Sequence, residues 1–526
     1  MIHYLNSKLI GMAALTFLSV NQQAIAQKVE SKQRPNILLI LADDMGYSDL
    51  GCYGSEIKTP NLDRLADNGV RMTQFYNAAR CCPSRASLLT GLYQHQAGVG
   101  HMDKDIGTPA YQGYINKTSV TLAEALKVNG YNTYHVGKWH VGEEFENWPI
   151  ERGFNRAWGP VGGSINYFKP KPRKVIALDN NRWFAPDSGF YMTNAMGDFA
   201  ISFLDEEVDK PEPFFMYLAF TAPHWPLQAL PEDIAKYQGK YMQGFEEIRK
   251  QRFERMKKLG VIDRNTKLSP LDQDSPDWDS LSQEEKKRWD LRMAVYAAML
   301  DNMDQNIGRV IVKLEKMDEL DNTLIIFLSD NGGCAERINF KERNELSSET
   351  GTPESFDSYE YPWANVSNTP FRQYKKWSHE GGVSTPLIAW WNGKIKPQIN
   401  RTSGHIIDLM PTLIDVAGGA YPKEYNGNAI TQEEGISLLP LFEGENMKDT
   451  RLLFWEHEGN AAVRDGKWKL VKEYNIDKWE LYNIDEDRSE LDDLSEKYPK
   501  KVQELIAKWN EWSDRVGVRP FKGSYR

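Results

Sequence analysis

Short, unbroken runs of apolar residues recur along this chain, and they constrain its fold more than any other feature. The first run covers residues 36–42, directly after Pro35, and contains no charged side chain. Similar runs occur at residues 131–136, 214–220, 322–328 and 386–391. A strand buried on both faces is apolar throughout, whereas a half-buried strand alternates between apolar and polar residues. The runs therefore predict the inner strands of a sheet that is covered on both faces.

Helical patterns separate these runs. Residues 60–68 begin with Pro60, which suits the first position of a helix, and Thr59 precedes it as an N-cap. Residues 291–320 keep one apolar face, formed by Tyr296, Met299, Leu300, Met303, Ile307, Val310, Ile311 and Leu314. Strands that alternate with helices predict a large α/β domain with a mainly parallel or mixed sheet.

The composition argues against several classes of protein. The 526 residues include 64 Lys and Arg against 74 Asp and Glu, a net charge of −10, which disfavours a nucleic-acid-binding protein. Hydrophobic residues make up 40% of the chain, enough for a large core. The cysteines are Cys52, Cys81, Cys82 and Cys334, so we expect no disulfide framework.

Residues 1–26 have the pattern of a secretory signal peptide. Lys8 is the only Lys or Arg in this stretch, and the mainly apolar residues 9–20 follow it. Ala24-Ile25-Ala26 then fits a cleavage site of small residues. The apolar run is too short to span a bilayer, so we expect no membrane anchor. Because no cysteine follows the run to carry a lipid, we expect a periplasmic or secreted protein.

Two structural units are expected after the signal peptide. Residues 27–440 hold the alternating strands and helices of the large α/β domain. Within them, residues 238–290 are rich in charge and predict a partly helical surface excursion, most of whose charges face solvent. Residues 441–526 predict a small α+β subdomain: strands at 452–455, 461–464, 468–471 and 479–482, a hairpin turn at Asp465-Gly466, and a helix at 499–516.

Residues 81–91, Cys-Cys-Pro-Ser-Arg-Ala-Ser-Leu-Leu-Thr-Gly, carry the most specific chemical signal. Pro83 suits the first turn of a helix and Gly91 its C-terminal cap. Cys81 would then lie at a helix N-terminus, where backbone N–H groups favour an anion, with Arg85 one turn further on the same face. The alternative is a buried structural cysteine beside a surface arginine. A thiolate phosphatase is disfavoured, because it needs an arginine six residues after its cysteine.

The pattern Cys-x-Pro-Ser-Arg followed by Leu-Thr-Gly resembles the signature of type I sulfatases. The resemblance extends over nearly the whole mature chain, with the bacterial arylsulfatase branch most similar. It implies an alkaline phosphatase/sulfatase-like fold: a large mixed β-sheet sandwiched by helices, with a small C-terminal subdomain of an antiparallel sheet plus a helix. Residues 27–440 would be the sulfatase catalytic domain. The resemblance also implies that a formylglycine-generating maturation enzyme oxidises Cys81 to Cα-formylglycine, and that Cys82 is a variable position.

Acidic and amide residues end two of the predicted inner strands. Asp43-Asp44 follow the first run, and Asp330-Asn331 follow the run at 322–328. Ligands gather at the carboxyl ends of strands in open α/β sheets. Three carboxylates and an amide oxygen suit one hard divalent cation such as Ca²⁺ rather than Zn²⁺. Either pair alone is equally an ordinary strand-ending turn; the resemblance implies that both pairs and the oxygen at position 81 ligate the ion.

Basic residues lie near other strand ends. Lys138 and His140 follow the second apolar run, His224 follows the third, and Lys375 precedes the last. Singly, each reads as a surface lysine or a packed histidine. Their shared location predicts a positive pocket in an acidic protein. The spacing of the family selects Lys375 rather than the adjacent Lys376.

The resemblance also implies roles in an attack on sulfur. The hydrated aldehyde, a gem-diol held by the metal and Arg85, would attack in line with Asp330 as proton acceptor, giving a sulfo-enzyme intermediate. His140 would take the proton of the second hydroxyl, which expels inorganic sulfate. Fixed cations would stabilise the charge that spreads over the sulfuryl oxygens.

Three residues are implied at the leaving group. His224 with Lys375 would protonate or stabilise the departing alcohol, and Lys138 would bridge the sulfate and the leaving oxygen. Weaker candidates for substrate recognition are His457, His95, His101, Trp158 and Trp225, for which core packing is the alternative reading.

The implied function is that of a secreted sulfatase, a sulfuric ester hydrolase acting on a small-molecule or carbohydrate sulfate ester. Two alternatives remain open from the sequence: a phosphate or phosphonate ester hydrolase of the same fold, and a catalytically silent binder of sulfated glycans that keeps Cys81 as a thiol. A dinuclear zinc phosphatase would need a second cluster of His and Asp where this chain offers Lys138 and Lys375. The sequence leaves the oligomeric state and the choice between aryl and sugar sulfate undecided.

Overall fold

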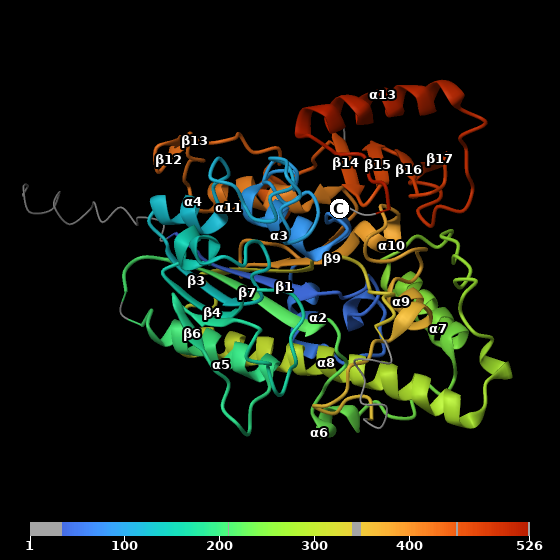
Figure 1. The fold of residues 1–526 in the computed structure, drawn as a ribbon, viewed down its shortest axis with the longest axis horizontal. Coiled ribbons are helices and arrows are strands. Elements are labelled where there is room, and N and C mark those ends of the chain that lie inside the picture. The colour runs from blue at the N-terminus through green and yellow to red at the C-terminus, as the bar shows by residue number, and fades with distance from the viewer. Residues whose placement is uncertain (1–33, 209, 339–348, 449–450, 524–526) are drawn as a thin grey trace, which may run out of the picture. The chain divides into compact units, whose positions relative to one another are not determined.

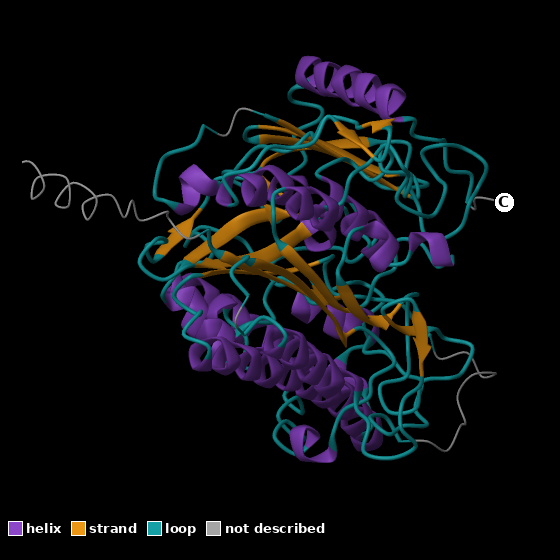
Figure 2. Ribbon diagram, turned by 90° about the vertical axis from the view of Figure 1, so that its left-hand side faces the viewer, coloured by secondary structure: helices purple, strands orange, loops and turns teal. Residues whose placement is uncertain are grey.

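The computed structural model describes residues 34–208, 210–338, 349–448 and 451–523, and residues 35–526 form one compact unit. The signal peptide predicted for residues 1–26 lies outside the described residues. A large β-sheet runs through the unit, with helices on both faces (Figures 1 and 2). None of the helices among the described residues is long and apolar enough to cross a membrane.

Within the described residues the large sheet has eleven strands, in the order β10-β2-β9-β8-β1-β7-β3-β4-β5-β6, with β11 beside β2. The strands are β1 (Asn36–Asp43), β2 (Val70–Tyr76), β3 (Asn132–Gly137), β4 (Arg156–Pro160), β5 (Ile176–Leu178), β6 (Asn181–Trp183), β7 (Phe214–Pro223), β8 (Thr323–Ser329), β9 (Ser384–Trp390), β10 (Gln398–Asn400) and β11 (Gly404–His405). A separate short hairpin pairs β12 (Glu424–Tyr425) with β13 (Asn428–Ala429).

The centre of the sheet is parallel. Strand β1 pairs in parallel with β7 and β8, and β3 pairs in parallel with β7 and β4. Strand β9 is antiparallel to both β8 and β2. The carboxyl ends of β1, β3, β7 and β8 therefore meet at one edge of the sheet, as the apolar runs predict for a mixed sheet.

Helices cover both faces of this sheet. The helices are α2 (Pro60–Asp67), α3 (Cys81–Thr90), α4 (Leu122–Val128), α5 (Met192–Asp205), α6 (Pro231–Ile234), α7 (Phe245–Leu259), α8 (Gln283–Lys316), α9 (Glu360–Ser367), α10 (Glu380–Val383), α11 (Leu409–Val416), α12 (Leu439–Phe442) and α13 (Pro499–Val516). Short 3₁₀ helices are η1 (Gly51–Tyr53), η2 (Phe145–Asn147), η3 (Ile150–Arg152), η4 (Trp278–Ser280) and η5 (Ile406–Asp408).

Successive residues of β1 point to opposite layers of core. Leu38 and Ile40 belong to a cluster with apolar residues of α2, α5 and α8. Leu39 and Leu41 belong to a second cluster with residues of α3, α4 and α11. This two-sided burial is the reason why the strand is a continuous apolar run.

The C-terminal residues form a four-stranded antiparallel sheet of β14 (Leu452–His457), β15 (Asn460–Asp465), β16 (Trp468–Lys472) and β17 (Trp479–Asn483), covered by α13 (Figure 1, red). Leu505 and Trp512 of α13 pack on Val463 and Leu470 of this sheet. The predicted fold class, a helix-covered mixed sheet with a small antiparallel subdomain, is confirmed. The boundary between residues 440 and 441 stays a prediction. The hairpin turn lies one residue later than predicted, because Asp465 pairs with Trp468.

The charge-rich segment at 238–290 is partly helical and most of its charged residues are at least partly exposed, as predicted, but two arginines are exceptions. Arg249 and Arg252 of α7 are buried rather than solvated. The Arg252 guanidinium donates to Asp49 Oδ1 at 2.6 Å and to Glu56 Oε1 at 2.8 Å. Local composition could not show this, because both carboxylates come from a distant part of the chain.

Other differences concern element bounds. Helix α8 begins at Gln283 rather than near residue 291, because Ser282 and Glu285 form a capping box at its start. Strand β2 has no counterpart among the apolar runs, since Arg71 and Gln74 interrupt its sequence. Thr59 holds the N-cap position of α2 without a capping hydrogen bond; its hydroxyl donates to Asp63 Oδ1 instead.

Candidate active site

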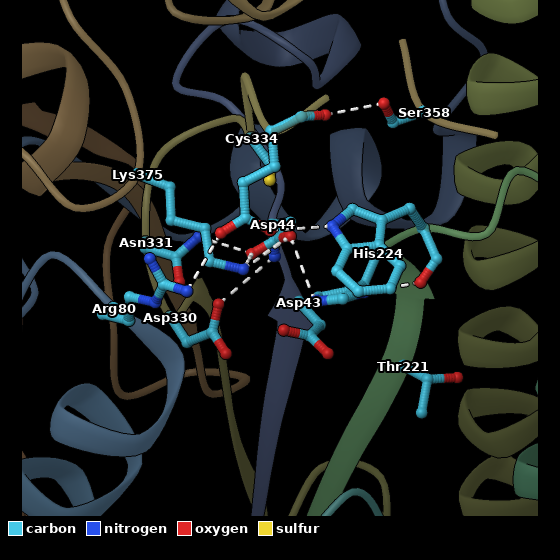
Figure 3. Close-up of polar contacts among 12 residues, drawn as sticks. Asp43, Asp44, Arg80, Thr221, His224, Asp330, Asn331, Cys334, Ser358 and Lys375 are labelled. Carbon is cyan, nitrogen blue, oxygen red and sulfur yellow. Dashed lines mark hydrogen bonds and ion pairs between the residues drawn. The ribbon is translucent and has the colours of Figure 1, made fainter. Parts of the chain in front are cut away.

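Polar side chains at the ends of four parallel strands lie at one edge of the large sheet. Asp43 ends β1 and Asp330 follows β8. His224 follows β7, and Lys138 follows β3. These side chains, with Asp44, Asn331 and Lys375, point toward one another where the strands end (Figure 3 shows all but Lys138). The edge is buried, since each of these side chains has little or no exposed surface.

The acidic part of the site is an oxygen-rich cluster. The backbone N–H of Asp44 donates to Asp330 Oδ1 at 3.2 Å, and Asn331 Nδ2 donates to Asp44 Oδ1 at 2.7 Å. Within the described residues, Asp43 Oδ1 and Asn331 Oδ1 are buried and accept no hydrogen bond. Buried polar atoms normally have a partner. Three carboxylates and an unpartnered amide oxygen fit a hard divalent cation.

Basic groups face this cluster from three directions. Lys138 Nζ lies 2.6 Å from Asp43 Oδ2, and Lys375 Nζ lies 2.7 Å from Asp44 Oδ1. The His224 ring also faces the cluster, with Nε2 at 3.5 Å from Asp44 Oδ2. Since buried charges are stable only when paired, the lysines compensate the carboxylates.

These interactions shift the pKa values of the site. Burial raises the pKa of Asp43, but the charges of Lys138 and His224 outweigh it and the pKa is lowered. Burial lowers the pKa of Lys375, but the negative groups around it, Asp44 foremost, together outweigh burial and hold the pKa well above its ordinary range. Burial lowers the pKa of His224. The site therefore favours the charged forms of Asp43 and Lys375 and the neutral form of His224.

Cys81 is the first residue of α3, and its thiol lies among cations. The hydrogen bond with Cys82 lowers the pKa of Cys81 most, burial opposes this, and the charges of Lys138 and His140 lower the pKa further, to well below its ordinary range. The ring of His140 and the sulfur atoms of Cys81 and Cys82 lie within 4.8 Å of one another. An anion at position 81 is therefore favoured.

Arg85 links α3 to two strand ends. Its Nε and Nη2 donate to Asp330 Oδ2 at 3.1 and 2.9 Å, and its Nη1 donates to the carbonyl of Lys138 at 2.8 Å. Arg85 is fully buried. Helix α3 ends at Gly91, whose φ of 70° suits the expected cap. The helix is thus held in place at the end that carries Cys81.

The structure brings together every residue predicted for the site: Asp43, Asp44, Cys81, Arg85, Lys138, His140, His224, Asp330, Asn331 and Lys375. The adjacent Lys376 turns away, and its Nζ lies 2.6 Å from Glu458 Oε2. The roles of these residues and the identity of a metal ion stay predictions.

Of the weaker candidates for substrate recognition, some are packed in the core and one lies beside the site. Trp158 is buried and stacks on Phe199 at 4.2 Å, so it belongs to the core. His95 Nε2 lies 2.9 Å from Glu456 Oε2, a buried contact to the C-terminal sheet. Trp225, by contrast, follows His224 directly and is only partly buried.

Sequence reasoning missed three charged neighbours of the site. Arg80 Nη2 lies 2.9 Å from Glu336 Oε1, and Trp225 Nε1 donates to Glu336 Oε2 at 3.0 Å. Asp103 Oδ2 lies 3.7 Å from His140 Nε2. Arg80 could have been predicted as a neighbour of the site, because it directly precedes Cys81 in the sequence. Asp103 and Glu336 could not, because they lie in loops without a recognisable pattern.

Two family models match the chain. Residues 35–420 match the model described as Sulfatase, and residues 371–513 match the model described as N-sulphoglucosamine sulphohydrolase, C-terminal. The chain is 36% identical over 455 residues to an arylsulfatase of Klebsiella aerogenes, with 82% of this chain and 96% of the relative covered. It is 36% identical over 537 residues to an uncharacterized sulfatase of Schizosaccharomyces pombe, with 94% and 96% covered.

Solved structures share this fold. The crystal structure of Ps i-CgsB in complex with k-i-k-neocarrahexaose matches with a TM-score of 0.67 and 27% sequence identity. The match covers 91% of this chain and 93% of that one. The similarities in sequence and in structure thus extend over most of the chain.

Proposed function

The chain belongs to the sulfatase family and is a sulfuric ester hydrolase, and on this basis we propose that it is an exported enzyme that hydrolyses aryl sulfates or terminal sulfated sugars through a formylglycine at position 81. One observation carries the proposal: Cys81, at the start of α3, lies in the same buried site as the oxygen cluster and the lysines. The similar structure in complex with k-i-k-neocarrahexaose supports a carbohydrate sulfate ester as substrate.

The proposed nucleophile is the hydrated aldehyde made from Cys81, which supplies an oxygen for attack on sulfur. Lys138 and His140 favour negative charge at this position. Arg85 fixes the helix that carries it through its contacts with Asp330 and the Lys138 carbonyl. Asp330 is suited to accept a proton, because burial and the Asp43 charge raise its pKa well above the ordinary value.

Ca²⁺ is the proposed metal, held by Asp43, Asp44, Asp330 and Asn331. Their all-oxygen donor set supports this choice, as do the oxygens of Asp43 and Asn331 that, within the described residues, are buried and accept no hydrogen bond. The family implies a divalent metal in general. When bound, the ion supplies positive charge for the oxygens of the sulfuryl group.

The basic residues that face the oxygen cluster are proposed to act on the leaving alcohol. His224, whose Nε2 lies 3.5 Å from Asp44 Oδ2 at the site, would donate a proton to the departing oxygen. Lys375 and Lys138 carry fixed positive charge beside it and would stabilise the charge that develops there. His140, beside Cys81 and Asp103, is placed to take the proton of the second hydroxyl at position 81, which releases sulfate.

A phosphate ester hydrolase with two metal ions is less well supported. Lys138 and Lys375 occupy the space next to Asp43 and Asp44, and their positive charge disfavours a second cation there. A preparation that turns over a phosphate ester faster than the matched sulfate ester would contradict the proposal.

The decisive experiment combines intact mass with activity. The protein is produced together with a formylglycine-generating enzyme, alongside Cys81→Ala and, as the matched control, Cys82→Ala. We expect the mature wild type and the mature Cys82→Ala variant each to have a mass about 18 Da below that calculated with a cysteine at position 81, because a thiol becomes an aldehyde. Sulfate release from nitrophenyl sulfate should be lost in Cys81→Ala. An active wild-type preparation whose Cys81 is unmodified rules out the formylglycine proposal.

A further inference from the structure

Cys82 is a buried cysteine that the proposed mechanism does not use. It lies in α3 directly after Cys81, and its side chain is fully buried. The sulfur atoms of Cys81 and Cys82 and a ring nitrogen of His140 lie within 4.8 Å of one another. These three residues are here called the sulfur cluster. Because His140 follows β3, the sulfur cluster joins the start of a helix to the end of a strand.

The sulfur cluster has the dimensions of a metal site. In sites built from cysteine and histidine, metal–sulfur bonds are about 2.3 Å long and metal–nitrogen bonds about 2.0 Å. Two sulfur ligands of one ion are therefore at most about 4.6 Å apart. The three ligand atoms lie within a limit of 4.8 Å, which exceeds that distance only slightly. Small rotations of the side chains would bring all three atoms onto one ion.

One ring nitrogen of His140 is free to bind a ligand. Among the described residues, the buried Nδ1 has no hydrogen-bond partner. The other nitrogen, Nε2, lies 3.7 Å from Asp103 Oδ2, and a Cβ atom added at Gly163 would come within 3.0 Å of it. A histidine that binds a metal through one nitrogen usually turns the other toward a carboxylate. His140 has this arrangement, with Nε2 toward Asp103 and Nδ1 left for an ion.

The two sulfur atoms decide which metals fit. Thiolates are soft ligands that select ions such as Cu⁺ or Zn²⁺, whereas Ca²⁺ takes oxygen ligands. The hydrogen bond with Cys82 and the positive groups nearby, Lys138 foremost, together outweigh burial and hold the pKa of Cys81 well below its ordinary value. A thiolate is therefore favoured at position 81 before any ion binds. Cys82 would release its proton when the ion binds.

Charge favours Cu⁺ over Zn²⁺ at these ligands. Cys81 lies at the N-terminus of α3 and among the charges of Lys138 and Lys375, an environment that stabilises an anion. Cu⁺ with two thiolates carries one positive and two negative charges, so the complex is an anion. Zn²⁺ with the same ligands gives a neutral complex, which these fixed charges do not stabilise.

We propose that Cys81, Cys82 and His140 bind one Cu⁺ ion in the chain whose Cys81 is still a thiol. This site does not depend on the proposed function, because the sequence encodes all three ligands. Conversion of Cys81 to an aldehyde would remove one of the two sulfur ligands and put a hard oxygen in its place. The same position would then change from binding a soft ion to binding a hard one. Copper loading and conversion are thus mutually exclusive states of the protein.

A titration of the unconverted protein tests the proposal. The protein is produced without a formylglycine-generating enzyme, and its intact mass establishes that Cys81 is a thiol. Cu⁺ is then titrated under anaerobic conditions in competition with a coloured Cu⁺ chelator, and we expect one equivalent to bind. Cys81→Ser and Cys82→Ser should each weaken binding by about a hundredfold or more, since each replaces a soft ligand with a hard one. His140→Phe should weaken binding by about tenfold or more, because the nitrogen ligand is lost.

Controls separate metal binding from folding. Cys52→Ser and Cys334→Ser remove the two buried cysteines outside the sulfur cluster and should leave the Cu⁺ affinity unchanged. Thermal melting without metal establishes that each variant is folded. Where Cys82→Ser does not fold, Cys81→Ser and the converted protein still test the site, because both lack the sulfur atom at position 81. Zn²⁺ in about tenfold excess should not displace the bound Cu⁺.

Four results would overturn the proposal. These are a folded thiol form that binds no Cu⁺, a Cu⁺ affinity that is unchanged in folded Cys82→Ser, displacement of Cu⁺ by Zn²⁺, or a converted protein that binds Cu⁺ as tightly as the thiol form. An active preparation that keeps Cys81 as a thiol contradicts the formylglycine proposal instead, which is a distinguishable outcome.

Discussion

Unusual backbone angles place several residues of the site. Asp44, His140 and Lys376 have positive φ values of 67°, 61° and 92°. Such angles are unfavourable for residues with a Cβ atom and persist only where the surroundings enforce them. At Lys376 the consequence is direct: the chain turns between two lysines, so that Lys375 meets Asp44 and Lys376 meets Glu458. Adjacent residues thereby serve different parts of the structure.

Removal of a divalent cation should destabilise the protein. Without an ion, repulsion among the buried carboxylates of Asp43, Asp44 and Asp330 is offset by nearby basic groups, chiefly Lys138, Lys375 and Arg85. We expect saturating Ca²⁺ to stabilise the chelator-treated protein by about 3 kcal/mol at a hundredfold excess over its dissociation constant. Differential scanning calorimetry with and without Ca²⁺ measures this shift.

Matched variants identify the source of the Ca²⁺ effect. Asp330→Asn should abolish most of the shift, whereas Asp290→Asn, a buried carboxylate of α8 outside the site, should retain it. A shift that is equally large for Zn²⁺ and survives in Asp330→Asn would argue against an oxygen-liganded Ca²⁺ site.

Among the elements, α7 shows how a charged segment is anchored. Arg252 of α7 is buried and binds Asp49 and Glu56, which lie on either side of η1. Burial raises the pKa of Glu56, but the charge of Arg252 and its hydrogen bonds outweigh burial and lower the pKa from 4.5 to about 2. The pair therefore couples the docking of α7 to pH.

The sign of this coupling can be tested. Because the pKa of Glu56 is depressed in the folded state, its contribution to stability is complete above pH 4.5 and is lost as pH falls toward about 2. A shift of this size corresponds to about 3 kcal/mol. We expect Glu56→Gln to be destabilised near neutral pH and the difference from wild type to shrink below pH 4.5 in urea unfolding. Glu315→Gln, which breaks the exposed pair with Arg64, should change stability by less than about 1 kcal/mol at every pH. A pH-independent difference for Glu56→Gln would refute the coupling.

For the whole molecule, a buried ion network joins the small sheet to the large one. Lys469 of β16 lies 2.8 Å from Glu380 Oε1 of α10 and 2.9 Å from Glu490 Oε1, and all three side chains are fully buried. Arg488 Nε pairs with the second oxygen of Glu380 at 2.9 Å. Separation of the two sheets would leave these charges unpaired.

Unfolding should consequently be cooperative across both sheets. We expect a single calorimetric transition for the wild type, and Lys469→Met should lower the stability of the whole by about 3–5 kcal/mol, because it removes the buried cation that Glu490 shares with one oxygen of Glu380. Lys508→Met, at a half-buried pair on the surface of the C-terminal sheet, serves as the control. Two separate transitions, with Lys469→Met moving only the smaller one, would show instead that residues 441–526 unfold independently.

The sequence allowed the centre of the molecule to be predicted but not its periphery. Inner strands and the residues that end them, such as Asp43 and Asp330, follow from local apolar runs and from the rule that parallel strands share a carboxyl edge. The stacking of His101 on His457, or the pairing of Arg252 with Asp49, depends on long connections whose paths no local pattern specifies. Strand β2 was missed for a related reason, since its edge-side position tolerates Arg71 and Gln74.

The burial of Cys81 has a consequence for the order of events in the cell. Its side chain is 1% exposed in the folded protein and lies beneath residues from several distant segments. A modifying enzyme that must bind the peptide around position 81 cannot reach this sulfur atom once the large sheet has folded. If position 81 is converted as proposed, the conversion competes with folding, and chains that fold too early stay inert for the rest of their lifetime.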